Sequence, residues 1–169
     1  MRPQIAKATR MIHAPGAEIY NIIADYRTMH PLILPKPYFL SLDVEEGGTG
    51  EGTIVNFQMR ILGQTRSFRS LITEPEPFDA AQDRPGRILL ETDLASGVVT
   101  RFRVSSADNG HLAEVTISTE LKGLGMVEGF FAKRMLQKVY REELDLLARL
   151  AEKQNTLTQS ASTGARSAL

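Results

Sequence analysis

The chain has 169 residues, 42% of them hydrophobic and 24% charged, which is the composition of one ordinary globular domain. Lysine plus arginine (20) equals aspartate plus glutamate (20), so no overall positive field attracts nucleic acid or an anionic membrane. Cysteine is absent, which excludes disulfides, thiol nucleophiles and cysteine metal sites. No apolar run has the length of a membrane span, and the first ten residues lack the apolar core of a signal peptide. We therefore expect a cytoplasmic protein that does not insert into membranes.

The N-terminal part of the chain predicts one strand followed by two short helices. Residues 4–13 alternate as a strand does. Pro15 then suits the first turn of a helix, and three isoleucines recur three and four residues apart on one helical face. A second short helix is expected over residues 27–34. It ends at Pro35, because the residue before a proline is pushed out of helical geometry.

The middle of the chain predicts an antiparallel sheet. From residue 38 the hydrophobic period changes to two, with one apolar and one polar face, as in a sheet that has one side in water. The expected strands cover residues 38–46, 53–61, 67–75, 87–94, 98–105 and 113–121. The loop between the third and fourth of these strands contains an insertion, residues 78–85, which is either a lid or a neutral surface loop.

The C-terminal part predicts one long helix over residues 126–153. Its second half carries a regular apolar stripe of Leu136, Tyr140, Leu144, Leu147 and Ala151. Residues 155–169 are small and polar, so we expect a disordered tail after a single domain of residues 1–154. The whole pattern is an α+β fold in which about seven strands curve around a long C-terminal helix.

Four segments of the sequence resemble the SRPBCC superfamily, which includes the START proteins and the birch-pollen allergen. These segments are "MIHAPGAEIYNIIADYRTMHPLILP", "GGTGEGTIVNFQMRILG", "EPEP…GRILLETD" and "YREELDLLARLAE". They are most similar to the polyketide cyclase/dehydrase-like and coenzyme-Q-binding-protein-like branches. The resemblance implies a helix-grip fold with a deep apolar cavity between sheet and helix. It does not settle function, because members bind lipids, sterols, quinones or polyketides and only a minority catalyse.

The first half of the long helix indicates where such a cavity lies. Extended backwards, the apolar stripe of this helix passes through Ala132, Gly129 and Gly125, which have almost no side chain. We interpret this gap as room kept for a ligand; the alternative is close packing of the helix on the sheet. Hydroxyls in the lining would orient the ligand. The predicted lining is Val55, Phe57, Met59, Phe68, Ser70, Ile72, Leu90, Thr100, Phe102, Val115, Ile117, Thr119, Gly125, Gly129, Phe130, Phe131 and Met135.

The segment of residues 24–39 has two interpretations. In the enzyme interpretation, His30 is a general base oriented by Asp25, and Tyr26 or Tyr38 stabilises an enolate. In the structural interpretation, which we prefer, the segment is a hinge, and its gate residues plug one end of the cavity. The gate residues are Ile33, Leu34 and Pro35. The three histidines have no ligand spacing, so neither a metal nor a cofactor is expected.

The sequence therefore predicts a domain that binds an apolar small molecule, lipid-like or polyketide-like, for transport or sequestration. A cyclase or dehydratase acting on a polyketide-like carbonyl compound is the first alternative, although no catalytic constellation is convincing. A partner-binding module akin to quinone chaperones is the second alternative. The expected partner is a hydrophobic small molecule, and neither the sequence nor the resemblance identifies a protein partner.

Overall fold

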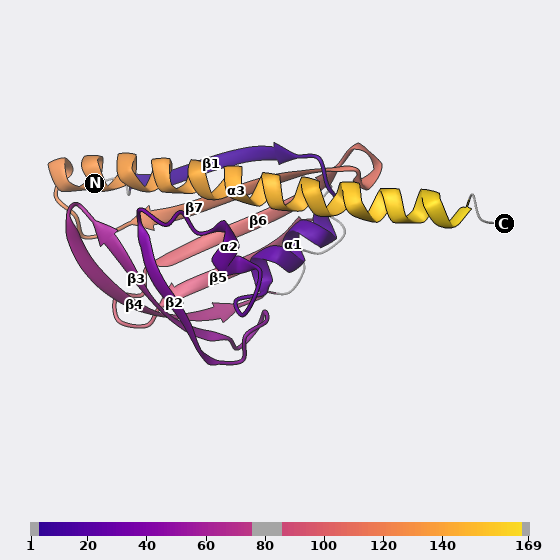
Figure 1. Ribbon diagram of the computed structural model, residues 1–169. Helices are drawn as coiled ribbons and strands as arrows, with labels where there is room; N and C mark the ends of the chain where they lie inside the picture. Colours follow the sequence, from indigo (N-terminus) through magenta and orange to yellow (C-terminus); the bar gives the residue numbers. More distant parts are fainter. Residues whose placement is uncertain (1–3, 76–85, 167–169) are drawn as a thin grey trace.

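The computed structural model describes residues 4–75 and 86–166, and these form a seven-stranded antiparallel sheet with one long helix across it (Figure 1). The elements in chain order are β1 (Gln4–Ile12), α1 (Gly16–Ala24), α2 (His30–Ile33), β2 (Phe39–Glu46), β3 (Ile54–Ile61), β4 (Gln64–Thr73), β5 (Gly86–Asp93), β6 (Val99–Ala107), the 3₁₀ turn η1 (Asp108–Gly110), β7 (Leu112–Leu121) and α3 (Met126–Arg166). The predicted α+β helix-grip class and order of elements are confirmed. The predicted insertion at residues 78–85 lies outside the described residues.

The order of strands in the sheet is β1-β7-β6-β5-β4-β3-β2, so the first two strands of the chain form its opposite edges. The connection from β1 to β2, which contains α1 and α2, therefore has to cross one face of the sheet. α2 is shorter than the helix expected over residues 27–34, because a turn precedes it. In that turn the Asp25 carboxylate accepts hydrogen bonds from the backbone N–H groups of Arg27 and Thr28, both at 3.0 Å.

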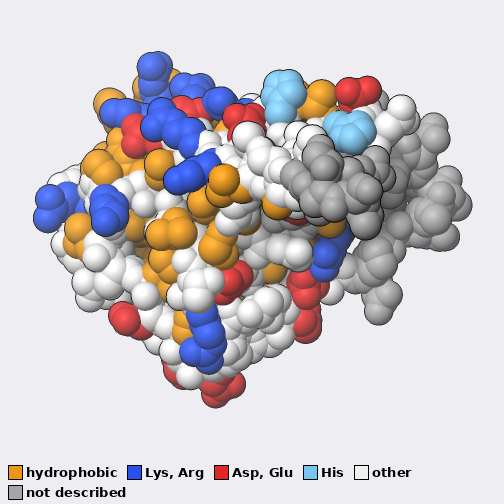
Figure 2. All heavy atoms as spheres, turned by 45° about the vertical axis from the view of Figure 1, so that its right-hand side comes forward, with side chains coloured by type: hydrophobic (Ala, Val, Ile, Leu, Met, Phe, Trp, Pro, Cys, Tyr) orange, Lys and Arg blue, Asp and Glu red, His pale blue; other side chains and the backbone are white. Residues whose placement is uncertain are grey.

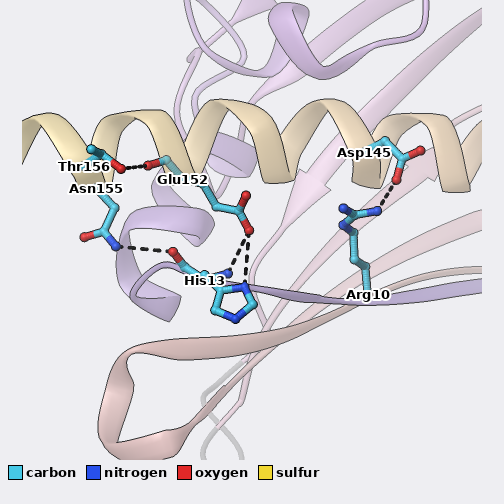
Figure 3. A network of polar contacts seen from close by, with 6 residues as sticks. All are labelled: Arg10, His13, Asp145, Glu152, Asn155 and Thr156. Carbon is cyan, nitrogen blue, oxygen red and sulfur yellow. Dashed lines mark hydrogen bonds and ion pairs between the residues drawn. The ribbon is translucent and has the colours of Figure 1, made fainter.

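The second half of the helix predicted from the sequence, residues 139–153 of α3, closes the hydrophobic core. It packs against β1, β7, α1 and α2, and it buries Val139, Tyr140, Leu144, Leu147, Ala148 and Ala151. Polar contacts fasten the helix to the edge strand β1 and the residue after it (Figure 3). Arg10 pairs with Asp145, and the His13 backbone N–H donates to Glu152 at 3.1 Å. The position of α3 on the sheet is thus fixed by this half of the helix.

The expectation of a disordered tail from residue 155 differs from the structure, in which α3 continues to Arg166. Extending an existing helix adds a backbone hydrogen bond for each residue fixed, without a new nucleus. Asn155 also donates to the His13 carbonyl at 3.3 Å, and the Thr156 hydroxyl donates to the Glu152 carbonyl at 2.9 Å (Figure 3). The last turns project beyond the sheet (Figure 1), and there Leu157 is 62% exposed.

Candidate ligand cavity

A cavity of about 520 Å³ lies between the curved sheet and the first half of α3. Its wall comes from the α1–α2 segment, from six of the strands and from α3, and it is mostly apolar. The apolar wall is formed by Leu34, Phe39, Leu42, Val55, Phe57, Met59, Ile61, Phe68, Val98, Phe102, Ala132, Met135 and Leu136. A volume and lining of this kind are typical of sites for small organic molecules.

The structure places part of the predicted lining on this wall. The predicted residues that do line the cavity are Val55, Phe57, Met59, Phe68, Ser70, Thr100, Phe102, Thr119 and Met135. Ile72, Val115 and Ile117 point inward but are fully buried in the solid core instead. The sheet side of the wall therefore belongs mainly to β3 and β4, and β2, β5, β6 and β7 each contribute two residues.

The β5 part of the prediction is wrong by one residue. Leu89 and Asp93 are buried, whereas Leu90 lies on the opposite face, so Glu91 and Asp93 are the β5 residues that line the cavity. Side chains in a strand alternate with a period of two, so a shift of one residue exchanges the two faces completely. The adjacent leucines at 89 and 90 allow both assignments.

The start of α3 also differs from the prediction. Phe130 and Phe131 are 50% and 55% exposed, and they point away from the cavity. Gly125 is exposed, and Gly129 is buried beside the Gln4 side chain, whose amide nitrogen would lie 3.0 Å from an added Cβ. Close packing of the helix on β1 thus accounts for Gly129, whereas Glu128 and Ala132 line the cavity.

The buried end of the cavity holds a polar cluster around Glu91. The Tyr26 hydroxyl donates to Glu91 Oε1 at 2.5 Å, and His30 Nε2 lies 3.7 Å from the same oxygen. The other ring nitrogen of His30, Nδ1, is 2.6 Å from the Ile23 carbonyl oxygen, which can only accept. The neutral imidazole therefore carries its proton on Nδ1 and presents a bare Nε2 to the cavity side. The Tyr26 and His30 rings stack with centroids 4.3 Å apart.

Burial shifts the pKa values of this cluster in opposite directions. It raises the pKa of the Glu91 carboxyl to about 7, although the hydrogen bond from Tyr26 acts against the shift. It lowers the pKa of His30 to about 4, so the imidazole is neutral at physiological pH. The site therefore holds a neutral base beside a carboxyl that changes its charge near neutral pH.

A second buried carboxyl, Glu143 of α3, lines the same end of the cavity. It is 2% exposed, and its Oε1 atom has no hydrogen-bond partner among the described residues. Burial, and next the charge of Glu91, hold the pKa of Glu143 well above its usual range. Burial therefore favours the protonated acid of this side chain, and one of its hydrogen-bonding atoms is left for something inside the cavity.

Three hydroxyls form a chain next to these carboxyls. Thr100 and Thr119 are joined by an oxygen–oxygen distance of 2.8 Å, and the Thr119 hydroxyl lies 2.6 Å from the Tyr140 hydroxyl. Burial raises the pKa of Tyr140 to about 12, so it remains a neutral donor. The predicted hydroxyls of β6 and β7 thus satisfy one another and present a polar strip to the cavity.

The structure brings together only two of the four catalytic candidates. Tyr26 and His30 line the cavity, whereas the Asp25 carboxylate caps the following turn, and the His30 imidazole bonds to the Ile23 carbonyl instead. The Tyr38 hydroxyl lies 3.5 Å from Glu142, away from the cavity lining.

Of the predicted gate residues, Leu34 lines the cavity, while Ile33 and Pro35 are buried behind it.

Sequence reasoning missed Glu91 and Glu143. A signal for Glu143 was present, because it lies three residues after Tyr140 and four before Leu147, within the buried stripe of α3. A charged residue inside an apolar stripe marks a buried ionisable group. Within residues 4–75 and 86–166, no group of three or more His, Asp or Glu side chains is arranged to hold a metal ion.

Comparisons with known proteins agree with this architecture. The profile of the family described as "Polyketide cyclase / dehydrase and lipid transport" matches residues 3–152. Among solved structures, the KanY protein is 27% identical with a TM-score of 0.73, covering 90% of this chain and 99% of its own. No curated protein sequence matches this chain.

Two more distant structures share the fold at 15% identity. An aromatase/cyclase from a Streptomyces species has a TM-score of 0.62, covering 90% of this chain and 96% of its own. A START superfamily protein from Mycobacterium smegmatis has a TM-score of 0.53, covering 91% and 98%.

Proposed function

The chain belongs to the polyketide cyclase/dehydrase and lipid transport family of the SRPBCC superfamily, and from that premise we propose that it binds one apolar small molecule carrying a polar group. The observation that carries the proposal is the cavity itself: a mostly apolar chamber of about 520 Å³ with a cluster of buried polar side chains at one end. Transport or sequestration of a lipid-like or polyketide-like compound fits this arrangement.

The apolar wall and the polar end of the cavity make different contributions to ligand binding. Contact with the apolar wall supplies the affinity, at about 25 cal/mol for each Å² of apolar ligand surface removed from water, before the costs of association. The unpartnered oxygen of Glu143 sets the orientation, because a ligand carbonyl or hydroxyl placed there restores a missing hydrogen bond. A pure hydrocarbon would leave that atom unsatisfied.

Filling the cavity tests binding directly. The probe is N-phenyl-1-naphthylamine, a neutral dye that fluoresces in apolar surroundings. Ala132 lines the cavity, so Ala132→Phe should weaken dye binding by at least about tenfold without lowering thermal stability. Ala161→Phe, on the exposed end of the same helix, is the matched control and should bind like the parent protein. Failure of the parent protein to take up dye, or equal binding by both variants, would refute the proposal.

One observation favours catalysis as a second candidate function. An acid and a base face the same chamber, namely the Glu143 carboxyl and the bare Nε2 of His30, and burial shifts their pKa values in opposite directions, upward for Glu143 and downward for His30. This pair suits proton removal next to a ligand carbonyl: the base accepts the α-proton while Glu143 donates a hydrogen bond to the oxygen on which charge develops. That step is common to cyclase and dehydratase chemistry.

Deuterium exchange distinguishes the catalyst from a simple carrier. With 2-tetralone as a model ketone in D₂O, an enzyme should accelerate loss of the α-proton signal, and both Glu143→Gln and His30→Gln should remove the acceleration. The dye-binding measurement on the same variants shows whether the cavity is intact. Exchange no faster than in buffer, with dye binding retained, would leave the protein a binding module.

A further inference from the structure

The first turns of α3 do not have the usual arrangement of an amphipathic helix, in which large apolar residues face the protein. The side turned toward the protein carries Gly129 and Ala132, whereas the large apolar side chains face solvent. These are Met126, Val127, Phe130 and Phe131, with exposed fractions of 76%, 69%, 50% and 55%. We call this set the apolar α3 face. In a soluble helix, large apolar residues normally face the core, so an exposed cluster of them indicates a contact outside the domain.

The apolar α3 face lies beside the entrance to the cavity. Leu124 and Glu128, on either side of Met126 and Val127 in the chain, both line the cavity and are exposed. Across the opening, Leu62 at the β3–β4 turn also lines the cavity and is 63% exposed. A ligand that enters or leaves here therefore passes directly along this face.

Basic side chains flank the apolar α3 face. Arg134 lies one turn beyond Phe130, with its guanidinium carbon 5.7 Å from the ring centroid, and Lys133 is adjacent. Lys122 and Arg66 stand at the cavity entrance, opposed by Glu128 and by Glu120, which pairs with Lys122 at 3.8 Å. Figure 2 shows several Lys and Arg side chains at the upper left of the molecule, with Asp and Glu side chains among them. Four basic and two acidic side chains thus stand beside this face, although the whole chain has equal numbers of both.

We propose that the apolar α3 face docks on the surface of an anionic phospholipid bilayer. Exposed aromatic and aliphatic side chains on one side of a helix, with lysine and arginine beside them, are the composition of helices that lie in the membrane interface. No helix within residues 4–75 and 86–166 is long and apolar enough to cross a bilayer, so the contact is peripheral. Docking places the cavity entrance against the membrane, and an apolar ligand exchanges without crossing water.

The position of the cavity entrance favours a bilayer over a second protein. A protein partner on this face would cover the opening that Leu62, Leu124 and Glu128 surround, whereas a fluid lipid surface supplies or accepts the ligand there. A second copy of this chain would bring the same basic side chains together, which costs free energy through like-charge repulsion. Anionic lipid removes that cost, because each basic side chain gains from the surface potential.

Vesicle binding tests the proposal with the full chain. Co-sedimentation is measured with vesicles of phosphatidylcholine alone and of phosphatidylcholine mixed with phosphatidylglycerol, at low and high salt. Binding should require the anionic lipid and weaken with salt. The double change Phe130→Ser/Phe131→Ser should reduce it at least about tenfold, because two exposed rings no longer enter the interface. Lys133→Gln and Arg134→Gln should each reduce it about fivefold.

Control measurements separate docking from folding and from ligand binding. Leu157→Ser removes an apolar side chain with 62% exposure from the far end of the same helix, and it should bind vesicles like the parent protein. The phenylalanine variant should retain its thermal stability and its uptake of N-phenyl-1-naphthylamine, so loss of docking is distinguishable from loss of the cavity. No binding to anionic vesicles at low salt would overturn the proposal. Self-association without lipid that the same double change abolishes would also overturn it, and would assign the face to a dimer.

Discussion

The first turns of α3 and its residues 139–153 place their large apolar side chains differently. In residues 139–153, Leu144 and Leu147 are at most 1% exposed, and the helix closes the core. In the first turns, the small residues face inward and Phe130 and Phe131 face solvent. The same rod thus acts as a core element at one end and as the cover of a hollow at the other. This difference indicates that stability and function are separated along one helix.

The largest difference between these two parts of α3 should appear in the free energy of unfolding when one large apolar side chain in each part is truncated. Leu147→Ala should lower the free energy of unfolding by about 2–5 kcal/mol, because it leaves a void in a packed core. Phe130→Ala removes a larger side chain but should change that free energy by less than about 0.5 kcal/mol. Urea denaturation of both variants measures the contrast. Similar losses for the two would show that the first half of α3 is also packed.

The next effect is the pH dependence of stability, and it depends on Glu143, a buried residue of α3 that also lines the cavity. Its folded-state pKa lies above the unfolded value, so between the two the folded protein keeps a proton that the unfolded chain has released. Stability should therefore fall as pH rises above about 4.5, by at most about 1.4 kcal/mol per pH unit from this group. Glu143→Gln removes this contribution and should make the decline above pH 4.5 shallower.

Other buried groups shape the remainder of that pH profile. Glu91 contributes a decline of the same sign that ends near its pKa of about 7, and His30, with a lowered pKa of about 4, contributes an opposite slope below pH 6.5. Comparison of Glu143→Gln with the parent protein therefore isolates the contribution of Glu143. Glu142→Gln, the same change one residue away, is the control and should leave the pH profile unchanged. An unaltered slope in Glu143→Gln would contradict the burial of a protonated carboxyl.

The smallest effect concerns Gly129, where the first half of α3 rests on β1. Alanine favours a helix interior by up to about 1 kcal/mol over glycine. The added Cβ would lie 3.0 Å from the end of the Gln4 side chain, which can move. Gly129→Ala should thus leave stability equal or raise it by up to about 1 kcal/mol, as thermal unfolding would measure. A clear loss would indicate rigid packing at this point.

The order of elements could be predicted because it rests on local patterns. Alternating residues, turn residues and the stripe of α3 each specify their own segment, and together they define the helix-grip fold. The face of β5 could not be read from its sequence, because Leu89 and Leu90 are equally apolar and only pairing with β4 and β6 selects which one points inward. That ambiguity concealed Glu91.

The candidate site was harder to predict, because the orientation of its key side chains depends on which parts of the interior are left unfilled. The expectation that Phe130 and Phe131 line the cavity assumed that large apolar side chains turn inward. That rule fails where the helix covers open space instead of a core. Glu143 was obscured for the converse reason: a charged residue is normally assigned to the surface, although its spacing from Tyr140 and Leu147 places it in the buried stripe.

The most direct test of the central claim, an internal cavity that receives an apolar ligand, is methyl NMR of the methionines during titration with N-phenyl-1-naphthylamine. Met59 and Met135 line the cavity, whereas Met11 and Met126 are on the outside, 44% and 76% exposed. The account predicts that the methyl signals of Met59 and Met135 shift and saturate together while those of Met11 and Met126 stay in place. Shifts confined to Met126, or no shift at Met59 and Met135 at saturating dye, would contradict it.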